Sequence, residues 1–326
     1  MLNSQATRRV GHVHHGLDGD LVIVHLGRIG NPVPDVPPVI IGRFPATLNP
    51  KDHSVLIDAQ VKQPETSNRD SHPEEHPVAL RPNQAKHKLA AGETVCCVSG
   101  LTDPEDIDRF GPAGFDAVWL EGEHGPVDFR DIGDLTRACD LWGMTSIMRI
   151  NQNEQAIVYR ALDRGVQGIV VPHVNTKAEA ENVVAGGKFS PVGQRGLFTS
   201  RQGYGVENYF DNANDQTMFI VLIEDIVAVN NLDEILEVDH IDVFFVAPSD
   251  LASSMGLIGQ LDHPEVVATR EGALKKIVES GRVAGTLTFN DDVNHYTDMG
   301  VRFVMTSSGP WIDAGAAAFK SAAGIS

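Results

Sequence analysis

The chain has 326 residues, of which 42% are apolar, so it is long enough to bury one large core. Lysine and arginine total 26 and aspartate and glutamate total 44, which gives a formal net charge of −18. This acidity argues against binding to nucleic acid or to an anionic membrane surface. No run of uncharged apolar residues approaches the ~18 residues that a membrane span needs.

The cysteines and the first residues bear on the cellular compartment. Cys96, Cys97 and Cys139 form no C-x-x-C pair and no disulfide framework, which is typical of reduced thiols. Arg8 and Arg9 are not followed by the apolar segment that a secretory or twin-arginine signal requires. We therefore expect a cytoplasmic protein.

The first 82 residues differ in character from the rest. They hold 8 basic and 9 acidic residues, whereas the remaining residues hold 18 basic and 35 acidic ones. Three short apolar runs among turn-forming residues indicate strands at 21–26, 39–41 and 55–57. Residues 62–82 are polar and proline-rich, which is typical of a linker. We expect residues 1–82 to be an appendage and linker, and residues 83–326 to be the main domain.

Histidine is concentrated in the same segment. Seven of the thirteen histidines lie in residues 1–82, among them His12, His14 and His15. Two interpretations are open for them, a metal site or a solvated and mobile end of the chain.

From residue 83 onward, apolar β-branched runs alternate with helical stretches. The eight runs that predict strands are 94–99, 115–121, 145–150, 167–172, 219–224, 242–247, 283–288 and 302–307. The helix-like segments are 103–111, 129–142, 155–164, 177–185, 227–236, 264–280, 291–299 and 310–323. Eight such units indicate an α/β protein, a (β/α)8 TIM barrel with an extra N-terminal segment. The alternative, a doubly wound sheet, is disfavoured because no G-x-G-x-x-G motif follows the first run.

In a barrel of this kind, function gathers at the carboxyl ends of the strands. Glu224 and Asp250 end neighbouring runs, and two carboxylates would suit a hard divalent ion such as Mg²⁺ or Mn²⁺. The alternative is that each carboxylate caps the helix that follows it. Asp225 is the simpler cap, which leaves Glu224 freer to bind a metal.

Two further side chains at the strand ends are candidates for catalysis. His124, in a Glu-x-His turn, is a candidate proton carrier, and the flanking Glu121 and Glu123 would orient its ring and raise its basicity. Arg149 lies at the end of the third run. Burying an arginine there costs free energy unless it meets an anion, such as a substrate carboxylate or an enolate oxygen. The alternatives are a structural histidine on a loop and a buried structural ion pair.

The segment between the fourth and fifth runs, about 186–218, is long, and long barrel loops usually cover the site. It holds Arg195, which either binds a second anionic group of the substrate or serves as a structural tie. No lysine ends the second, third, fifth, sixth, seventh or eighth run, which disfavours Schiff-base chemistry on a strand lysine. Metal-assisted enolate chemistry remains.

Together these residues resemble the HpcH/HpaI aldolase family, the pyruvate-dependent class II aldolases of the wider citrate-lyase β superfamily. The resemblance covers residues 83–326, and residues 1–82 have no counterpart in it. It rests on motifs in the family's order: Glu121-Gly-Glu-His-Gly-Pro126, Arg149, Gly168-Ile-Val-Val-Pro-His173, Pro191-x-Gly-x-Arg-Gly196, Leu222-Ile-Glu224 and Val246-Ala-Pro-Ser-Asp-Leu251 followed by Met255-Gly256.

The resemblance implies a role for each of these site residues. His124 would be the catalytic base, and Arg149 would steady the enolate. Glu224 and Asp250 would be the metal ligands, with the amides of Ser249 and Asp250 near the pyruvate carboxylate.

The resemblance also implies an assembly. Asp163 matches an acidic position that reaches the histidine of a neighbouring subunit, and this catalytic role rests wholly on the resemblance. The family commonly forms hexamers built from trimers that exchange a terminal helix, so a homo-oligomer, trimer or hexamer, is expected.

Two positions depart from the family pattern. Glu121 stands where family members often have aspartate, and Leu222 stands where they often have a glutamine that touches waters at the site. The expected metal ligands and base are intact, so these departures bear on the water network and on substrate preference rather than on the core chemistry.

We therefore expect a metal-dependent class II aldolase, a carbon–carbon lyase that reversibly cleaves a 4-hydroxy-2-oxo acid to pyruvate and an aldehyde through a metal-bound pyruvate enolate. The expected cofactor is Mg²⁺, Mn²⁺ or Co²⁺. The alternatives are a decarboxylase of oxaloacetate or a related 2-oxo acid, a CoA-ester lyase of the citrate-lyase β type, and a non-catalytic binding barrel. The CoA-ester lyases usually lack the Glu-x-His turn, and a non-catalytic barrel would be expected to lose site residues that this chain keeps.

Overall fold

The computed structural model describes residues 10–15, 22–27, 39–40 and 78–325. The chain divides into two compact units, Met1–Pro73 and Glu74–Ser326. This division falls ahead of the expected boundary after residue 82, and the separability of residues 1–82 stays a prediction. In the described ranges, no helix is both long enough and apolar enough to cross a membrane.

The first unit holds a small antiparallel sheet in the order β1-β2-β3. Its strands are β1 (Val10–His15), β2 (Val22–Gly27) and β3 (Val39–Ile40). The runs at 21–26 and 39–41 predicted β2 and β3, and the run at 55–57 lies outside the described residues. β1 was not predicted because half of its residues are histidines, which are not among the strong strand formers.

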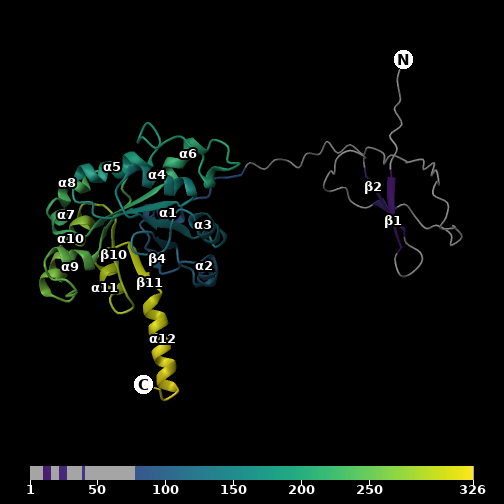
Figure 1. The fold of residues 1–326 in the computed structure, drawn as a ribbon. Coiled ribbons are helices and arrows are strands. Elements are labelled where there is room, and N and C mark those ends of the chain that lie inside the picture. The colour runs from purple at the N-terminus through teal and green to yellow at the C-terminus, as the bar shows by residue number, and fades with distance from the viewer. Residues whose placement is uncertain (1–9, 16–21, 28–38, 41–77, 326) are drawn as a thin grey trace. The chain divides into compact units, whose positions relative to one another are not determined.

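The second unit contains the predicted TIM barrel, a closed ring of eight parallel strands (Figure 1). The strands are β4 (Val95–Ser99), β5 (Ala117–Glu121), β6 (Thr145–Arg149), β7 (Gly168–Val171), β8 (Met218–Ile223), β9 (Val243–Val246), β10 (Ala284–Leu287) and β11 (Phe303–Ser307). Each strand pairs with the next one in the sequence, and β11 closes the ring on β4. Every predicted run matches one strand to within two residues at either end, because a parallel sheet buried on both faces needs continuous apolar segments.

All the predicted helical segments form helices. They are α2 (Pro104–Phe110), α3 (Ile132–Leu141), α4 (Gln155–Arg164), α5 (Lys177–Gly187), α7 (Ile226–Asn230), α8 (Leu232–Leu236), α10 (Pro264–Glu279), α11 (Val293–Asp298) and α12 (Gly309–Ala322). The segment 227–236 forms two helices rather than one, because the chain breaks at Asn231. Thr176 and Glu179 form a capping box that fixes the start of α5, and Gly165, at φ +120°, ends α4.

Several short helices were not predicted. They are α1 (Gln84–Ala90), α6 (Tyr209–Gln216), α9 (Pro248–Ser254) and the 3-10 turns η1 (Gly111–Ala113) and η2 (Arg201–Gly203). Helix α1 closes the amino-terminal end of the barrel, where Ala85 and Leu89 join the apolar interior. Its first turn is tied to β6, because the Ala85 N–H donates to Thr145 Oγ1 at 3.0 Å.

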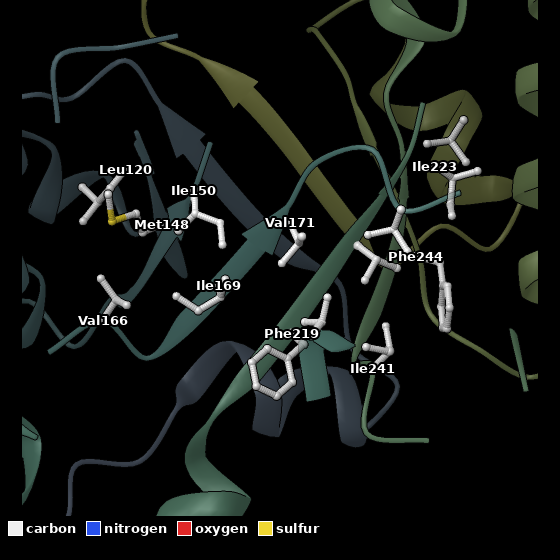
Figure 2. Close-up of a cluster of buried hydrophobic side chains, with 14 of the residues drawn as sticks. Leu120, Met148, Ile150, Val166, Ile169, Val171, Phe219, Ile223, Ile241 and Phe244 are labelled. Carbon is white, nitrogen blue, oxygen red and sulfur yellow. The ribbon is translucent and has the colours of Figure 1, made fainter. Parts of the chain in front are cut away.

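The barrel has two apolar layers, one inside the ring of strands and one between the strands and the surrounding helices. Alternate residues of β8 illustrate this, since Ile220 and Leu222 pack inside the ring whereas Phe219 and Ile223 pack under the helices. Figure 2 shows part of the outer layer, with Phe219, Ile223 and Phe244 on neighbouring strands. Each fully buried side chain of this kind contributes roughly 1.5–3 kcal/mol, so the strands fix the positions of the residues that follow them.

Helix α12 has a different environment. It runs away from the barrel to the C-terminus (Figure 1), and none of its residues is buried in the monomer. Its apolar side chains include Ile312 and Phe319, which are 67% and 75% exposed. Only its beginning is anchored, since Trp311 stacks on Phe110 with ring centroids 6.2 Å apart.

Candidate active site

Strands β5 and β6 bring an arginine and two glutamates together at the carboxyl-terminal mouth of the barrel. Glu121 and Arg149 are the last residues of their strands and lie side by side in the sheet register. Arg149 Nε lies 2.8 Å from Glu121 Oε2, and Nη2 lies 2.7 Å from the same oxygen. Arg149 Nη1 lies 2.9 Å from Glu123 Oε2. The ion pair considered for Arg149 is therefore present.

Arg149 keeps binding capacity despite these contacts. A guanidinium has five N–H groups. Among the described residues, Nε donates to Glu121, and the two terminal nitrogens each lie at ion-pair distance from one carboxylate oxygen. Each terminal nitrogen carries two N–H groups, so one carboxylate oxygen does not use both of its donors. The side chain is 16% exposed. Arg149 can thus be held by protein carboxylates and still present donors to an anion.

Glu121 connects this cluster to the histidine turn. Its Oε1 accepts hydrogen bonds from the N–H groups of Glu123 at 2.8 Å and His124 at 3.0 Å, and its Oε2 accepts from the indole Nε1 of Trp119 at 3.1 Å. Burial works to raise the pKa of the Glu121 carboxyl, but the hydrogen bonds from Arg149 and the two backbone N–H groups outweigh it and lower the pKa. The longer side chain at this position therefore serves as the acceptor that organises the turn.

His124 stands out from the turn toward solvent. Its side chain is 69% exposed, and its Nε2 lies 3.7 Å from Glu123 Oε2, too far for a good hydrogen bond. Glu121 touches the backbone N–H of His124 and not its ring. Of the two glutamates expected to orient the ring, Glu123 is thus the one beside it.

Glu224 follows β8 and is almost completely buried. Its side chain is 2% exposed, and its Oε1 accepts the backbone N–H of His173 at 2.7 Å. Burial raises the pKa of the Glu224 carboxyl, and the charges of Asp250 and Glu123 raise it further against the lowering effect of His173. Glu224 follows β8, Asp250 follows the paired strand β9, and Glu121 and Arg149 end β5 and β6, so in this closed parallel barrel all of them lie at the same end.

The alternative in which carboxylates cap the next helices does not match the structure. Asp225 occupies the N-cap position of α7 but makes no side-chain capping hydrogen bond, and α9 has no side-chain cap either. Ser249 and Asp250 lie in the first turn of α9. By helix geometry the N–H groups of a first turn have no partner within the helix, so they are available to an anionic ligand.

Glu224 and Asp250 suit a hard divalent cation. Both offer carboxylate oxygens, and the raised pKa of Glu224 means that its charge lacks full compensation within the described residues. Within those residues no group of three or more His, Cys, Asp or Glu side chains is arranged to hold a metal. Two protein carboxylates would leave the other coordination positions to water and substrate, a pattern that Mg²⁺ favours.

Asp163 and Arg195 lie together, away from these clusters in the same chain. Arg195 Nη2 is 2.7 Å from Asp163 Oδ1, and the Arg195 side chain is 2% exposed. Arg195 lines a small cavity with Gln167 and Thr217, residues that precede β7 and β8 and so mark the amino-terminal end of the barrel. Within the monomer, the pairing of Arg195 with Asp163 matches the structural tie, one of the two roles expected for Arg195. Asp163 does not contact His124 of the same chain.

The floor of the mouth is apolar. Leu222 is 1% exposed and belongs to the interior layer with Trp119 and Phe245. The Trp119 and Phe245 rings pack with centroids 5.4 Å apart, and the Arg149 guanidinium lies 6.0 Å from the Trp119 ring centroid. Sequence reasoning missed Trp119, although its place two residues before Glu121 puts both side chains on the same face of β5.

Comparison with known proteins agrees with this geometry. The profile of the HpcH/HpaI aldolase/citrate lyase family matches residues 95–308. A hydroxypyruvate/pyruvate aldolase of Roseobacter denitrificans is 36% identical over 228 residues, which cover 68% of this chain and 89% of that protein. A 5-keto-4-deoxy-D-glucarate aldolase of Escherichia coli O157:H7 is 34% identical over 232 residues, 70% of this chain and 91% of that protein.

Solved structures show the same fold. The HpcH/HpaI aldolase of Desulfitobacterium hafniense DCB-2 superimposes with a TM-score of 0.67 at 27% identity, over 72% of this chain and 96% of that one. The fold and the similar proteins place the chain among the lyases of the aldolase class. The chain belongs to the HpcH/HpaI aldolase/citrate lyase family.

Proposed function

We propose that the protein is a divalent-metal-dependent aldolase that cleaves a 4-hydroxy-2-oxo acid to pyruvate and an aldehyde, and that also catalyses the reverse addition. The observation that carries the proposal is the charge arrangement of the mouth. Arg149 and the exposed His124 both lie beside Glu123, and the buried Glu224 follows β8 while Asp250 follows the paired strand β9. The names of the two similar aldolases support the same chemistry.

The roles follow from the donors and acceptors at each position. Glu224 and Asp250 would hold a divalent cation, which would supply Lewis-acid stabilisation to the oxygens of a 2-oxo acid. The first-turn N–H groups of Ser249 and Asp250 would receive the substrate carboxylate. The free N–H groups of Arg149 would stabilise the enolate oxygen as negative charge develops on it.

His124 would act as the base. It would take the proton of the 4-hydroxyl group, directly or through one water, while the C3–C4 bond breaks and the electron pair of that bond becomes the enolate. Its exposure of 69% leaves the ring accessible, and Glu123 lies beside it. Protonation of the enolate at C3 then yields pyruvate.

Covalent catalysis by lysine is disfavoured by the placement of a buried lysine. Lys188 has a pKa lowered to about 7 by burial and by the charge of Lys86. Its Nζ donates to the backbone carbonyls of Asn214 and Thr217, and Thr217 precedes β8 at the amino-terminal end of the barrel. A lysine with a pKa suited to Schiff-base formation is thus at the opposite end from the mouth.

We further propose that the enzyme is a cytoplasmic homo-oligomer, a trimer or hexamer. The exposed apolar residues of α12 support this, because such a surface is unfavourable in water and favourable in an interface. The reach of Asp163 to the His124 of a neighbouring subunit belongs to this part of the proposal. Light scattering of the purified protein measures the assembly directly.

The test of the proposed activity is a screen of pyruvate release from 4-hydroxy-2-oxo acids, with and without Mg²⁺, Mn²⁺ or Co²⁺. We expect release only with metal, and a loss of release in EDTA that added metal reverses. Pyruvate release that is insensitive to EDTA, together with trapping of pyruvate on the protein by borohydride, would show a lysine-based mechanism instead.

A further inference from the structure

His173, two residues after the end of β7, has a backbone conformation that is uncommon for residues other than glycine. Its φ is +51°, in the left-handed region that residues with a Cβ seldom adopt. Such a conformation costs free energy and persists where the surrounding structure holds it, often at functional sites. In the described part of the chain, Asn208 and His240 are the other non-glycine residues with positive φ.

The contact that accompanies this conformation is made by the backbone. The N–H of His173 donates to Glu224 Oε1 at 2.7 Å, a short and therefore strong bond to a carboxylate. The ring is less engaged, because Nδ1 lies 3.4 Å from the same oxygen and 3.5 Å from Asp225 Oδ2, and the side chain is 59% exposed.

The positive φ explains how the chain can make this bond. After Val171 the chain must turn toward α5, which begins at Lys177. A left-handed residue at 173 allows that turn while its N–H stays directed across to β8. Pro172 restricts the preceding backbone and has no N–H of its own, so the donor to Glu224 comes from position 173.

We propose that His173 is a positioning residue that acts through its left-handed backbone. Its N–H holds Oε1 of Glu224, which fixes the buried carboxylate and would leave the second oxygen for a cation. The inference rests on the proposed function, since it assigns Glu224 to the metal. It predicts that position 173 requires a residue that tolerates positive φ, and does not require an imidazole.

The experiment compares Mn²⁺ affinity by isothermal titration calorimetry in the wild type and three variants of the full chain. His173→Gly and His173→Asn remove the ring but keep residues that adopt the left-handed conformation, so both should bind Mn²⁺ within about twofold of the wild type. His173→Val disfavours that conformation, so we expect its affinity to fall by roughly 10- to 100-fold, the loss typical of outer partners of a metal ligand.

His240→Val provides a matched control. His240 has φ +66° and lines a cavity with Lys86 and Lys188 at the other end of the barrel. It should show the same kind of backbone strain without any loss of Mn²⁺ affinity. Circular dichroism of the metal-free variants checks that His173→Val remains folded, and His173→Asn keeps the comparison informative if it does not.

The outcomes separate this inference from the proposed function. Weak binding by His173→Gly and His173→Asn would mean that the imidazole itself is required, and unchanged binding by a folded His173→Val would mean that the conformation is not. Either result overturns the positioning role while metal binding by the wild type stands. No Mn²⁺ binding by the wild type would overturn both.

Discussion

The two ends of the barrel differ in how their charged side chains are paired. At the amino-terminal end, Lys86 Nζ lies 2.9 Å from Asp242 Oδ1, and Lys88 Nζ lies 2.8 Å from Asp116 Oδ1. At the mouth, Glu224 is within ion-pair distance of no lysine or arginine among the described residues, although its side chain is only 2% exposed. Lys86 and Lys88 are thus paired with carboxylates, whereas the buried carboxylate of Glu224 has no such partner and could be compensated by a ligand.

Asn83 shows how one buried polar side chain at the amino-terminal end has its hydrogen bonds satisfied. It is fully buried, and its Nδ2 donates to the carbonyls of Gln167 at 3.1 Å and Gln216 at 3.0 Å. Its Oδ1 accepts from the Lys86 N–H and from Thr145 Oγ1. One side chain thereby links the start of α1 to the residues that precede β7 and β8 and to the first residue of β6. The comparison indicates that contacts for stability lie at the amino-terminal end of the strands and the candidate site at their carboxyl-terminal end, as is usual in such barrels.

The largest expected effect, on metal affinity, comes from removing the charge of Glu224. Glu224→Gln should weaken Mn²⁺ binding by more than ~10²-fold, because it removes a ligand and not only an outer partner. Its metal-free stability should not fall, since the raised pKa of Glu224 shows that its charge is unfavourable there. Calorimetric titration and chemical denaturation measure the two effects. A Glu224→Gln protein that binds Mn²⁺ normally would remove the main contrast between the two ends.

The next effect concerns the base. His124→Ala should slow aldol cleavage by ~10²–10⁴-fold, the usual contribution of a general base. Metal affinity should be retained, and decarboxylation of oxaloacetate should suffer less because loss of CO₂ forms the enolate without a base. Steady-state assays of both reactions on one preparation make the comparison. Equal losses in both reactions would contradict the assignment of His124.

A smaller effect, on stability alone, is expected at the opposite end. Asn83→Ala removes a hydrogen bond from each of the Gln167 and Gln216 carbonyls and leaves the Thr145 hydroxyl without its acceptor, and an unsatisfied buried polar group costs about 1–3 kcal/mol. Urea denaturation should show the loss, whereas the metal affinity of the folded fraction should stay at the wild-type value. A change in metal affinity without a change in stability would mean that the two ends are not independent.

Lys188 gives the amino-terminal end a pH dependence. Its pKa is lowered to about 7 in the folded chain, whereas an unfolded lysine titrates near 10.5. Between about pH 7 and 10.5 the Lys188 side chain carries a proton in the unfolded chain but not in the folded chain. The contribution of Lys188 to the free energy of unfolding therefore rises with pH over this window and is lost as pH falls toward 7. Lys188→Met should flatten the stability profile from pH 7 to 10, with the exposed Lys275→Met as control. Parallel profiles for wild type and Lys188→Met would contradict the lowered pKa.

The smallest effect on the barrel is expected from deleting residues 1–82. The eight strands and α1 lie beyond this segment, so the remaining chain should fold and bind Mn²⁺. Some stability should be lost, because Arg81 pairs with Asp140 at 3.6 Å. Circular dichroism and titration calorimetry provide the measurements. An insoluble or unfolded product would show that the segment is part of the core.

The barrel could be predicted because its signal is local and strong. Every strand is an apolar run bounded by turn residues, and burial on both faces leaves no other place for it. Short polar helices were missed for the converse reason. The seven residues of α1 carry few apolar side chains, and tertiary contacts such as that of Ala85 with Thr145 make the helix stable. Asn231 divides one expected helix into two, although the sequence pattern runs through it.

The site was predictable at the level of strand ends but not at the level of contacts. The order of the motifs located Glu121 and Arg149 at the ends of their strands, and Glu224 and Asp250 after theirs. The pairing of Arg195 with Asp163 joins residues from a helix and a long loop, and no periodicity reports such a contact. The role of the His173 backbone depends on its φ angle, which the sequence does not reveal because residues other than glycine rarely adopt that conformation.

Exchange of the C3 protons of pyruvate in D₂O, followed by proton NMR, tests the central claim most directly. The proposed mouth should catalyse this exchange when Mg²⁺ is present, because the enolate is formed and reprotonated without any aldehyde. EDTA should abolish the exchange, and Glu224→Gln should lack it, whereas Lys188→Met should retain it. Exchange that persists in EDTA and disappears in Lys188→Met would contradict the account and move the chemistry to the other end of the barrel.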